Sequence, residues 1–172
     1  MREESNRQIV LKSRPAGYPD LDNFELIHSD IPDIKEGELL VRTLWMSLDP
    51  YMRGRIKESS QLGLGSTAHP IGQTMPGGTV GRVVLSKNPS IPTGSFVESP
   101  SGWQDYSVSN GRNLRLLNPE SAPLSTALGI LGMPGLTAYH GLFEIGKPQV
   151  GETLVVSAGS GEVGAVVGQL GK

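Results

Sequence analysis

The sequence of 172 residues contains no cysteine. This absence excludes disulfides, iron–sulfur clusters, thiolate zinc sites and a cysteine nucleophile. Long hydrophobic runs are also missing, since nothing approaches the ~18 consecutive apolar residues of a membrane span. The charged residues 1–7 are not followed by the apolar core of a secretory signal. We therefore expect a cytoplasmic protein that has no membrane partner.

An excess of charge of one sign is missing as well. Lys and Arg number 15 and Asp and Glu number 17, so the formal net charge is −2. That balance argues against a nucleic-acid partner, which would require a clustered cationic surface. His28, His69 and His140 are far apart and lack the spacing of metal ligands, so we predict no metal site. A hydrolase is not supported, because the G-x-S-x-G elbow is absent.

Glycine and proline are plentiful, at 23 and 13 residues, and they separate short apolar runs. This pattern predicts a mainly β fold in the first two-thirds of the chain, with a barrel-like or sandwich-like sheet. Residues 54–77 are polar and show no clean period, so we interpret them as a long, mobile surface loop. The predicted strands are residues 8–12, 24–28, 38–48, 79–85, 95–98, 103–108 and 113–117.

The pattern changes near residue 120. Ser125 is placed to begin a helix that runs through Leu131, and Pro134 suits the first turn of a second helix. This second helix is expected to run to about Ile145, with Gly146 as its stop. Residues 153–157 are β-branched and apolar, which predicts a strand buried on both faces of a parallel sheet.

A glycine-rich motif follows that predicted strand directly. Gly159, Gly161 and Gly164 fit G-x-G-x-x-G, and apolar residues with helical spacing come after them. The first glycine would permit a tight turn, the second a close approach to a pyrophosphate, and the third close packing of helix and strand. An ordinary glycine-rich turn between a strand and a helix is the alternative interpretation. The acidic residue that would select NAD over NADP is expected ~20 residues further on, past Lys172, so the residues present do not separate the two cofactors.

Three segments carry a resemblance to a known family. Residues 48–55 (LDPYMRGR), 101–106 (SGWQDY) and 131–139 (LGMPGLTAY) stand in the same order as similar segments of that family. The chain resembles the zinc-free branch of the medium-chain dehydrogenase/reductases. This branch contains leukotriene hydroxydehydrogenases, prostaglandin reductases, alkenal double-bond reductases and bacterial NADPH-dependent curcumin reductases, and the bacterial curcumin reductases look closest.

The resemblance implies a domain organisation. Residues 1–120 would form the N-terminal part of a GroES-like catalytic domain, a partly open β-barrel, and residues 121–150 a helical bridge. Residues 151–172 would be the first βα unit of a truncated Rossmann NAD(P)-binding domain. Family members are about twice as long, so the catalytic residues are expected beyond Lys172. For the 172 residues alone, the resemblance implies no activity and weak or no dinucleotide affinity.

The resemblance also implies a function. Family members use NADPH to reduce the C=C bond of α,β-unsaturated ketones and aldehydes, usually as homodimers and without zinc. Hydride would pass to the β-carbon, and the resulting enolate would be stabilised by hydrogen-bond donors. Two alternatives remain open: a non-catalytic GroES-like binding or scaffold module, and a quinone oxidoreductase of the same superfamily.

The matching positions give the candidate site residues. Tyr51 corresponds to a side chain that faces the substrate, although packing of a turn aromatic on the sheet is an equal alternative. Met133 and Thr137 correspond to positions that line the nicotinamide, with core packing as the alternative for Met133. Arg53 and Arg55 are expected to pair with acids such as Asp49. The residues placed at the pyrophosphate are Ala158, Gly159, Ser160, Gly161, Val163 and Gly164. Trp103 and Tyr106 are expected in the core or the cleft wall.

Overall fold

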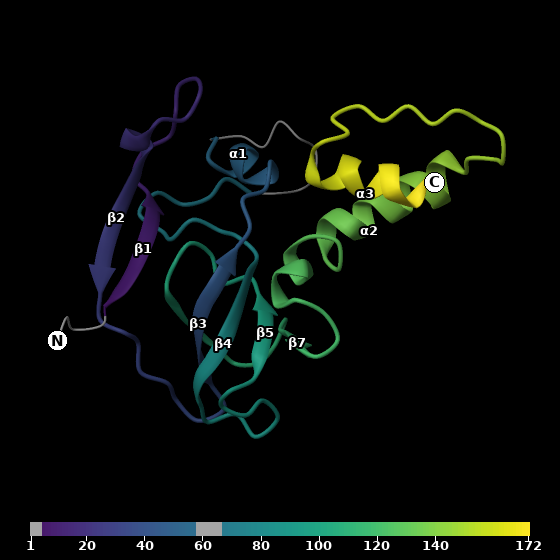
Figure 1. The fold of residues 1–172 in the computed structure, drawn as a ribbon. Helices are drawn as coiled ribbons and strands as arrows, with labels where there is room; N and C mark the ends of the chain where they lie inside the picture. The colour runs from purple at the N-terminus through teal and green to yellow at the C-terminus, as the bar shows by residue number, and fades with distance from the viewer. Residues whose placement is uncertain (1–4, 58–66) are drawn as a thin grey trace. The chain divides into compact units, whose positions relative to one another are not determined.

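The computed structural model describes residues 5–57 and 67–172. The chain divides into two compact units, Met1–Leu117 and Asn118–Lys172. Figure 1 shows the strands of the first unit and the helices of the second. No helix among the described residues is long and apolar enough to cross a bilayer.

The first unit contains two antiparallel sheets. In the smaller sheet β1 (Asn6–Leu11) pairs with β2 (Phe24–Ser29), and a 3-10 helix, η1 (Leu21–Asn23), precedes β2. The larger sheet has the order β6-β3-β4-β5-β7. Its strands are β3 (Leu39–Met46), β4 (Thr79–Ser86), β5 (Phe96–Ser99), β6 (Tyr106–Ser109) and β7 (Arg115–Leu117). Each predicted strand of this region is present, and the sheets form the partly open arrangement that was expected rather than a closed barrel.

One core cluster of the larger sheet lies on one face of β3 and β4. Leu39 and Val41 on β3 are fully buried beside Val83 on β4 and Val97 on β5. Alternation places these side chains on the same face, because successive residues of a strand point to opposite sides. Burial of each such side chain stabilises the fold by about 1.5–3 kcal/mol.

A second core cluster corrects the prediction for residues 54–77. Met75 is buried against Leu11 and Ile56, and its N–H donates to the Ile9 carbonyl at 2.8 Å. This end of the segment is therefore anchored beside β1 by an apolar side chain and backbone hydrogen bonds, and it is not a mobile surface loop. Residues 54 and 55 belong to a helix, and residues 58–66 lie outside the described residues.

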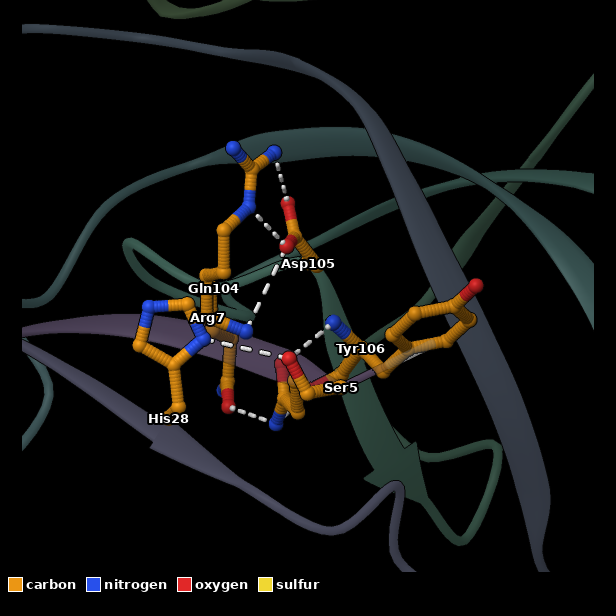
Figure 2. A network of polar contacts seen from close by, with 7 residues as sticks. Ser5, Arg7, His28, Gln104, Asp105 and Tyr106 are labelled. Carbon is orange, nitrogen blue, oxygen red and sulfur yellow. Dashed lines mark hydrogen bonds and ion pairs between the residues drawn. The ribbon is translucent and has the colours of Figure 1, made fainter. Parts of the chain in front are cut away.

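A polar network joins β1 to the chain around β6 (Figure 2). The Asn6 side chain is 2% exposed, and its Nδ2 donates to the Tyr106 carbonyl at 3.0 Å. The N–H of Tyr106 donates back to Asn6 Oδ1 at 2.9 Å. Both polar ends of the buried amide are thus satisfied, as burial requires. Tyr106 itself lies in a core cluster with Leu40, as expected.

The second unit is helical. Its elements are η2 (Leu124–Leu128), α2 (Met133–Tyr139), η3 (His140–Gly146) and α3 (Glu162–Leu170). The first predicted helix is present as a short 3-10 helix. The second predicted helix begins as α2, with Pro134 in its first turn, and continues as the π-helix η3 to Gly146. The left-handed residue that ends it is Lys147 (φ 47°).

The predicted strand at residues 153–157 is wrong: this segment forms no strand. A parallel strand exists only through hydrogen bonds to neighbouring strands. All of the described strands belong to the two sheets of the first unit, so the described part of the second unit contains no strand with which this segment could pair. Leu154 instead meets the end of α3, where a Cβ on Gly171 would lie 2.4 Å from its Cδ2.

Candidate functional site

Tyr51 opens a short helix, α1 (Tyr51–Arg55), immediately after Pro50. Proline cannot continue the preceding extended segment, and its fixed φ suits the entry to a helix. Met52 and Gly54 are buried and anchor one side of α1. Tyr51 is half-buried. The first unit therefore holds this phenol at a fixed point on its surface.

The surroundings of Tyr51 keep its hydroxyl protonated. Burial of the side chain raises the pKa of Tyr51, and the nearby Asp49 carboxylate raises it further. The Arg55 guanidinium opposes this rise and lies 5.5 Å from the centroid of the Tyr51 ring, within cation–π range. At neutral pH Tyr51 is thus a neutral phenol that can donate a hydrogen bond.

The expectation that Arg53 and Arg55 pair with acids such as Asp49 is wrong for the described residues. Arg53 Nη2 donates to the Gly17 carbonyl, and Arg55 stacks over Tyr51. The ion pairs found among residues 5–57 and 67–172 are Arg7–Asp105 and Arg115–Glu98. Each α1 arginine therefore uses a partner without negative charge.

Met133 and Thr137 lie one turn apart on α2. Met133 is 53% exposed, which removes core packing within the second unit as the reason for a methionine here. Thr137 is also exposed, and its hydroxyl donates to the Met133 carbonyl at 2.7 Å. Because residues four apart share a helix face, both side chains are open to the same region of surface.

The glycine-rich segment forms a tight turn that leads into α3. Ala158, and not a glycine, has left-handed backbone in this turn (φ 51°). Its carbonyl accepts the N–H of Gly161 at 2.9 Å, and α3 begins at the next residue. The expected role of Gly159 in the turn geometry is therefore filled by Ala158. Sequence patterns do not mark this position, because alanine seldom adopts positive φ.

Gly164 is the glycine that the turn requires. A Cβ at this position would lie 2.4 Å from the Ala158 carbonyl oxygen and 3.0 Å from the Gly159 Cα. Gly164 therefore lies close to the turn itself. The predicted packing of the helix against a strand is not formed, because residues 153–157 are not a strand. Gly161 is less crowded than Gly164, since a Cβ at Gly161 would lie 3.2 Å from the same carbonyl oxygen. Of the remaining positions, Ser160 is exposed and Val163 is 37% exposed.

The first turn of α3 carries one residue that the sequence did not single out. Glu162 is its first residue, and its Oε1 would lie 2.9 Å from a Cβ on Gly129. A carboxylate here is favoured by the partial positive charge of the helix N-terminus. The helix begins with backbone N–H groups that have no partner within the helix. The turn can therefore offer N–H donors to an anion.

The candidate residues belong to different units of the chain. Tyr51 lies in the first unit, whereas α2 and α3 pack against each other in the second. Met133, Thr137 and the glycine turn are thus parts of one compact unit. Among the described residues, no group of three His, Asp or Glu side chains is placed to hold a metal ion.

The comparisons with known proteins agree with this architecture. The family described as the N-terminal domain of oxidoreductase matches residues 7–117. The sheets of the first unit therefore define an oxidoreductase N-terminal domain, to which the second unit adds the glycine turn. The chain belongs to this family, within the medium-chain dehydrogenase/reductase branch that contains curcumin, prostaglandin and alkenal reductases.

Individual relatives cover nearly all of the chain. It is 49% identical over 171 residues to the NADPH-dependent curcumin reductase of Escherichia coli, covering 99% of this chain and 49% of that protein. It is 45% identical over 166 residues to prostaglandin reductase 1 of Bos taurus, covering 95% and 47%. A 2-alkenal reductase (NADP(+)-dependent) of Nicotiana tabacum is 38% identical over 174 residues, covering 99% and 50%.

The fold is also similar to a solved structure. CurA from Vibrio vulnificus in complex with NADPH superposes with a TM-score of 0.88 at 46% identity, covering 96% of this chain and 48% of that chain. The chain thus spans about half the length of the curated relatives it matches.

Proposed function

We propose that the protein reduces the C=C bond of α,β-unsaturated ketones and aldehydes with NADPH. The observation that carries this proposal is the 49% identity to a curcumin reductase over almost the entire chain. The relative described as a 2-alkenal reductase supports the unsaturated aldehyde, and the CurA structure supports NADPH. Because the chain spans about half of these proteins, the proposal concerns the protein as a whole.

The glycine turn fits the pyrophosphate of a dinucleotide. The turn closes only around a glycine at 164, where any Cβ would overlap the Ala158 carbonyl oxygen. Ala158 to Gly161 are exposed, and they precede a helix whose first N–H groups favour a phosphate. We assign Ala158, Gly159, Ser160, Gly161, Val163 and Gly164 to this role. When bound, NADPH supplies the hydride that the β-carbon of the substrate accepts.

Residues on α2 are proposed to line the nicotinamide. Met133 offers an exposed, flexible apolar surface. The Thr137 hydroxyl already donates a hydrogen bond to the Met133 carbonyl, so it can offer a ligand only its oxygen lone pairs as acceptors. This pair would therefore contact the ring through an apolar surface and one hydrogen-bond acceptor.

Tyr51 is proposed to contact the substrate. Its phenol is neutral at physiological pH, because burial and Asp49 raise its pKa. A neutral phenol can donate a hydrogen bond to the carbonyl oxygen of an enone.

The test uses protein expressed from the complete reading frame that encodes residues 1–172. We expect oxidation of NADPH with an enone, and mass spectrometry should find the saturated ketone. Tyr51→Phe should raise KM by about threefold to tenfold, the effect of one lost hydrogen bond. Tyr18→Phe is the matched control, because Tyr18 is 96% exposed. Oxidation of NADPH with quinones but not with enones would support a quinone oxidoreductase. No oxidation of NADPH with either class of substrate would support a binding module.

Two parts of the proposal concern the setting of the protein. The family resemblance implies a homodimer in the bacterial cytoplasm. Sedimentation equilibrium of the purified protein tests the dimer, and fractionation of the source cells tests the location. A monomer at micromolar concentration would remove the first part without affecting the proposed reaction.

A further inference from the structure

Gly77 lies where two segments that are distant in the sequence meet. A Cβ at this position would lie 3.1 Å from the Met52 Cε atom of α1 and 3.1 Å from the Trp103 Nε1 atom. Ordinary contacts of a Cβ are 3.4–4 Å, so both side chains rest against the bare backbone of residue 77. Met52 follows Tyr51 directly in α1 and is 5% exposed. Gly77 thus separates the buried side of α1 from the indole ring of Trp103.

Trp103 is fixed on its side of this contact. Its N–H donates to the Met75 carbonyl at 2.9 Å, and its carbonyl accepts the N–H of Ile9 at 2.9 Å. Its ring stacks on that of Phe24, with the two centroids 6.0 Å apart. The N–H of the residue before Trp103 also donates to the Gly77 carbonyl at 3.0 Å. Backbone hydrogen bonds therefore tie the indole ring and residue 77 together.

The α1 side of the contact is the side that can move. This helix contains 5 residues, and a helix of about one turn is held poorly by its own hydrogen bonds. Met52 is flexible, but its side chain is enclosed, and a packed interior transmits displacement to its neighbours. A side chain at residue 77 would need a few tenths of an ångström of additional space. That space would come from an outward shift of α1.

We propose that Gly77 is a positioning residue that determines how deeply Tyr51 is seated in the substrate site. Because residue 77 has no side chain, Met52 can rest against its backbone, and the phenol next to Met52 is held where it can reach the carbonyl of an enone. Gly77 is buried and acts only through α1. The inference rests on the proposed contact between Tyr51 and the substrate.

The proton of the phenol reports the position of the ring. Burial raises the pKa of Tyr51 most, and the charges of Asp49 and Arg55 act on it as well. Both charged residues lie within four residues of Tyr51, so they shift together with the ring when α1 moves. The burial of the ring then decreases while its charged neighbours stay beside it. Gly77→Ala should therefore lower the pKa of Tyr51, measured by ultraviolet titration of the full chain with Tyr51→Phe to identify the signal.

Kinetics of the protein expressed from the complete reading frame test the link to the substrate. Gly77→Ala should raise KM for an enone by about threefold to tenfold, the effect of one lost hydrogen bond. In a Tyr51→Phe background the same substitution should have no further effect on KM, because the hydroxyl that it displaces is already absent. Additive effects in the double variant would overturn the proposal, since Gly77 would then act through another group.

A control and a rescue variant separate positioning from a general loss of packing. Gly168→Ala is the matched control, because nothing lies within 4 Å of a Cβ at Gly168. Met52→Leu removes the Cε atom that the new Cβ would meet, and leucine and methionine interchange at low cost in a core. Added to Gly77→Ala, it should return both the pKa of Tyr51 and KM toward the wild-type values. No return would overturn the role of Met52. Should Gly77→Ala fail to fold by circular dichroism, the double variant is held to the wild-type pKa.

The two measurements also separate this proposal from the proposed function. The pKa of Tyr51 is measured without NADPH or an enone, so it reports the position of the ring even in a protein that reduces no enone. An unchanged pKa in folded Gly77→Ala would overturn the positioning role and leave the reductase proposal intact. A lowered pKa in a protein without reductase activity would support the control of Tyr51 by Gly77 and overturn the proposed function alone.

Discussion

Arg7 and Asp105 form a two-point ion pair across 98 residues of sequence (Figure 2). Arg7 Nε donates to Asp105 Oδ2 at 2.7 Å, and Nη2 donates to Oδ1 at 3.2 Å. The pair joins β1 to the residue before β6, beside the buried Asn6 amide. The hydrogen bond from Arg7 stabilises the carboxylate and lowers the pKa of Asp105.

This pair predicts a pH-dependent stability. Because the pKa of Asp105 is lower in the folded state than in the unfolded state, the ion pair contributes fully to the free energy of unfolding at pH values above the unfolded pKa. The contribution is lost as the pH falls through the folded pKa. Arg7→Gln should therefore lower Tm slightly at pH 7, since exposed pairs contribute little, and the difference from wild type should disappear in acid. Thermal unfolding at several pH values from neutral to acidic measures this difference in Tm, with Arg112→Gln as control. A difference that persists in acid would contradict its assignment to the Arg7–Asp105 pair.

The glycines of α3 predict opposite effects of the same substitution. A Cβ at Gly164 would overlap the Ala158 carbonyl oxygen, whereas nothing lies within 4 Å of a Cβ at Gly168. We expect Gly164→Ala to destabilise the second unit by about 1–3 kcal/mol through overpacking. Gly168→Ala should stabilise it by up to about 1 kcal/mol, because alanine favours the helix. Urea unfolding followed by circular dichroism measures both, and equal effects would show that the turn is not closed around Gly164.

Lys147 offers a stabilising substitution. It has left-handed backbone (φ 47°) at the end of η3, and its N–H donates to the Leu142 carbonyl at 2.8 Å. Left-handed backbone costs an L-residue about 1–2 kcal/mol, which glycine avoids. Lys147→Gly should therefore raise the free energy of unfolding by about 1 kcal/mol. Lys147→Ala removes the same charge but retains the Cβ, so a comparable gain in that variant would disprove the backbone explanation.

The sequence predicted the elements whose signals are local. The runs of β-forming residues in β3 and β4 and the Pro134 start of α2 each lie within a short stretch of neighbouring residues, and each prediction is confirmed. The strand at residues 153–157 failed, because apolar β-branched character shows that a segment can pair but not that a partner lies beside it.

In the candidate site, too, local sequence patterns predicted the local structure but not the contacts between distant segments. The G-x-G-x-x-G spacing correctly indicated a tight turn into a helix, and it identified Gly164 as the crowded position. Positive φ at Ala158 was hidden, since no residue preference marks it. The partners of Arg14 and Arg53 were also invisible, because both arginines are held by backbone carbonyls of distant segments, and every residue possesses a carbonyl.

The charges beside Tyr51 give the last prediction. Asp49 raises the pKa of Tyr51 and Arg55 lowers it, while burial raises it most. Asp49→Asn should therefore lower this pKa, and Arg55→Gln should raise it, because each variant removes one charge and leaves the burial in place. Ultraviolet titration of each variant, with Tyr51→Phe to identify the signal, measures the two shifts. Shifts of the same sign in both variants would mean that the substitutions act by exposing or burying the ring, and that the two charges do not control the proton of the phenol.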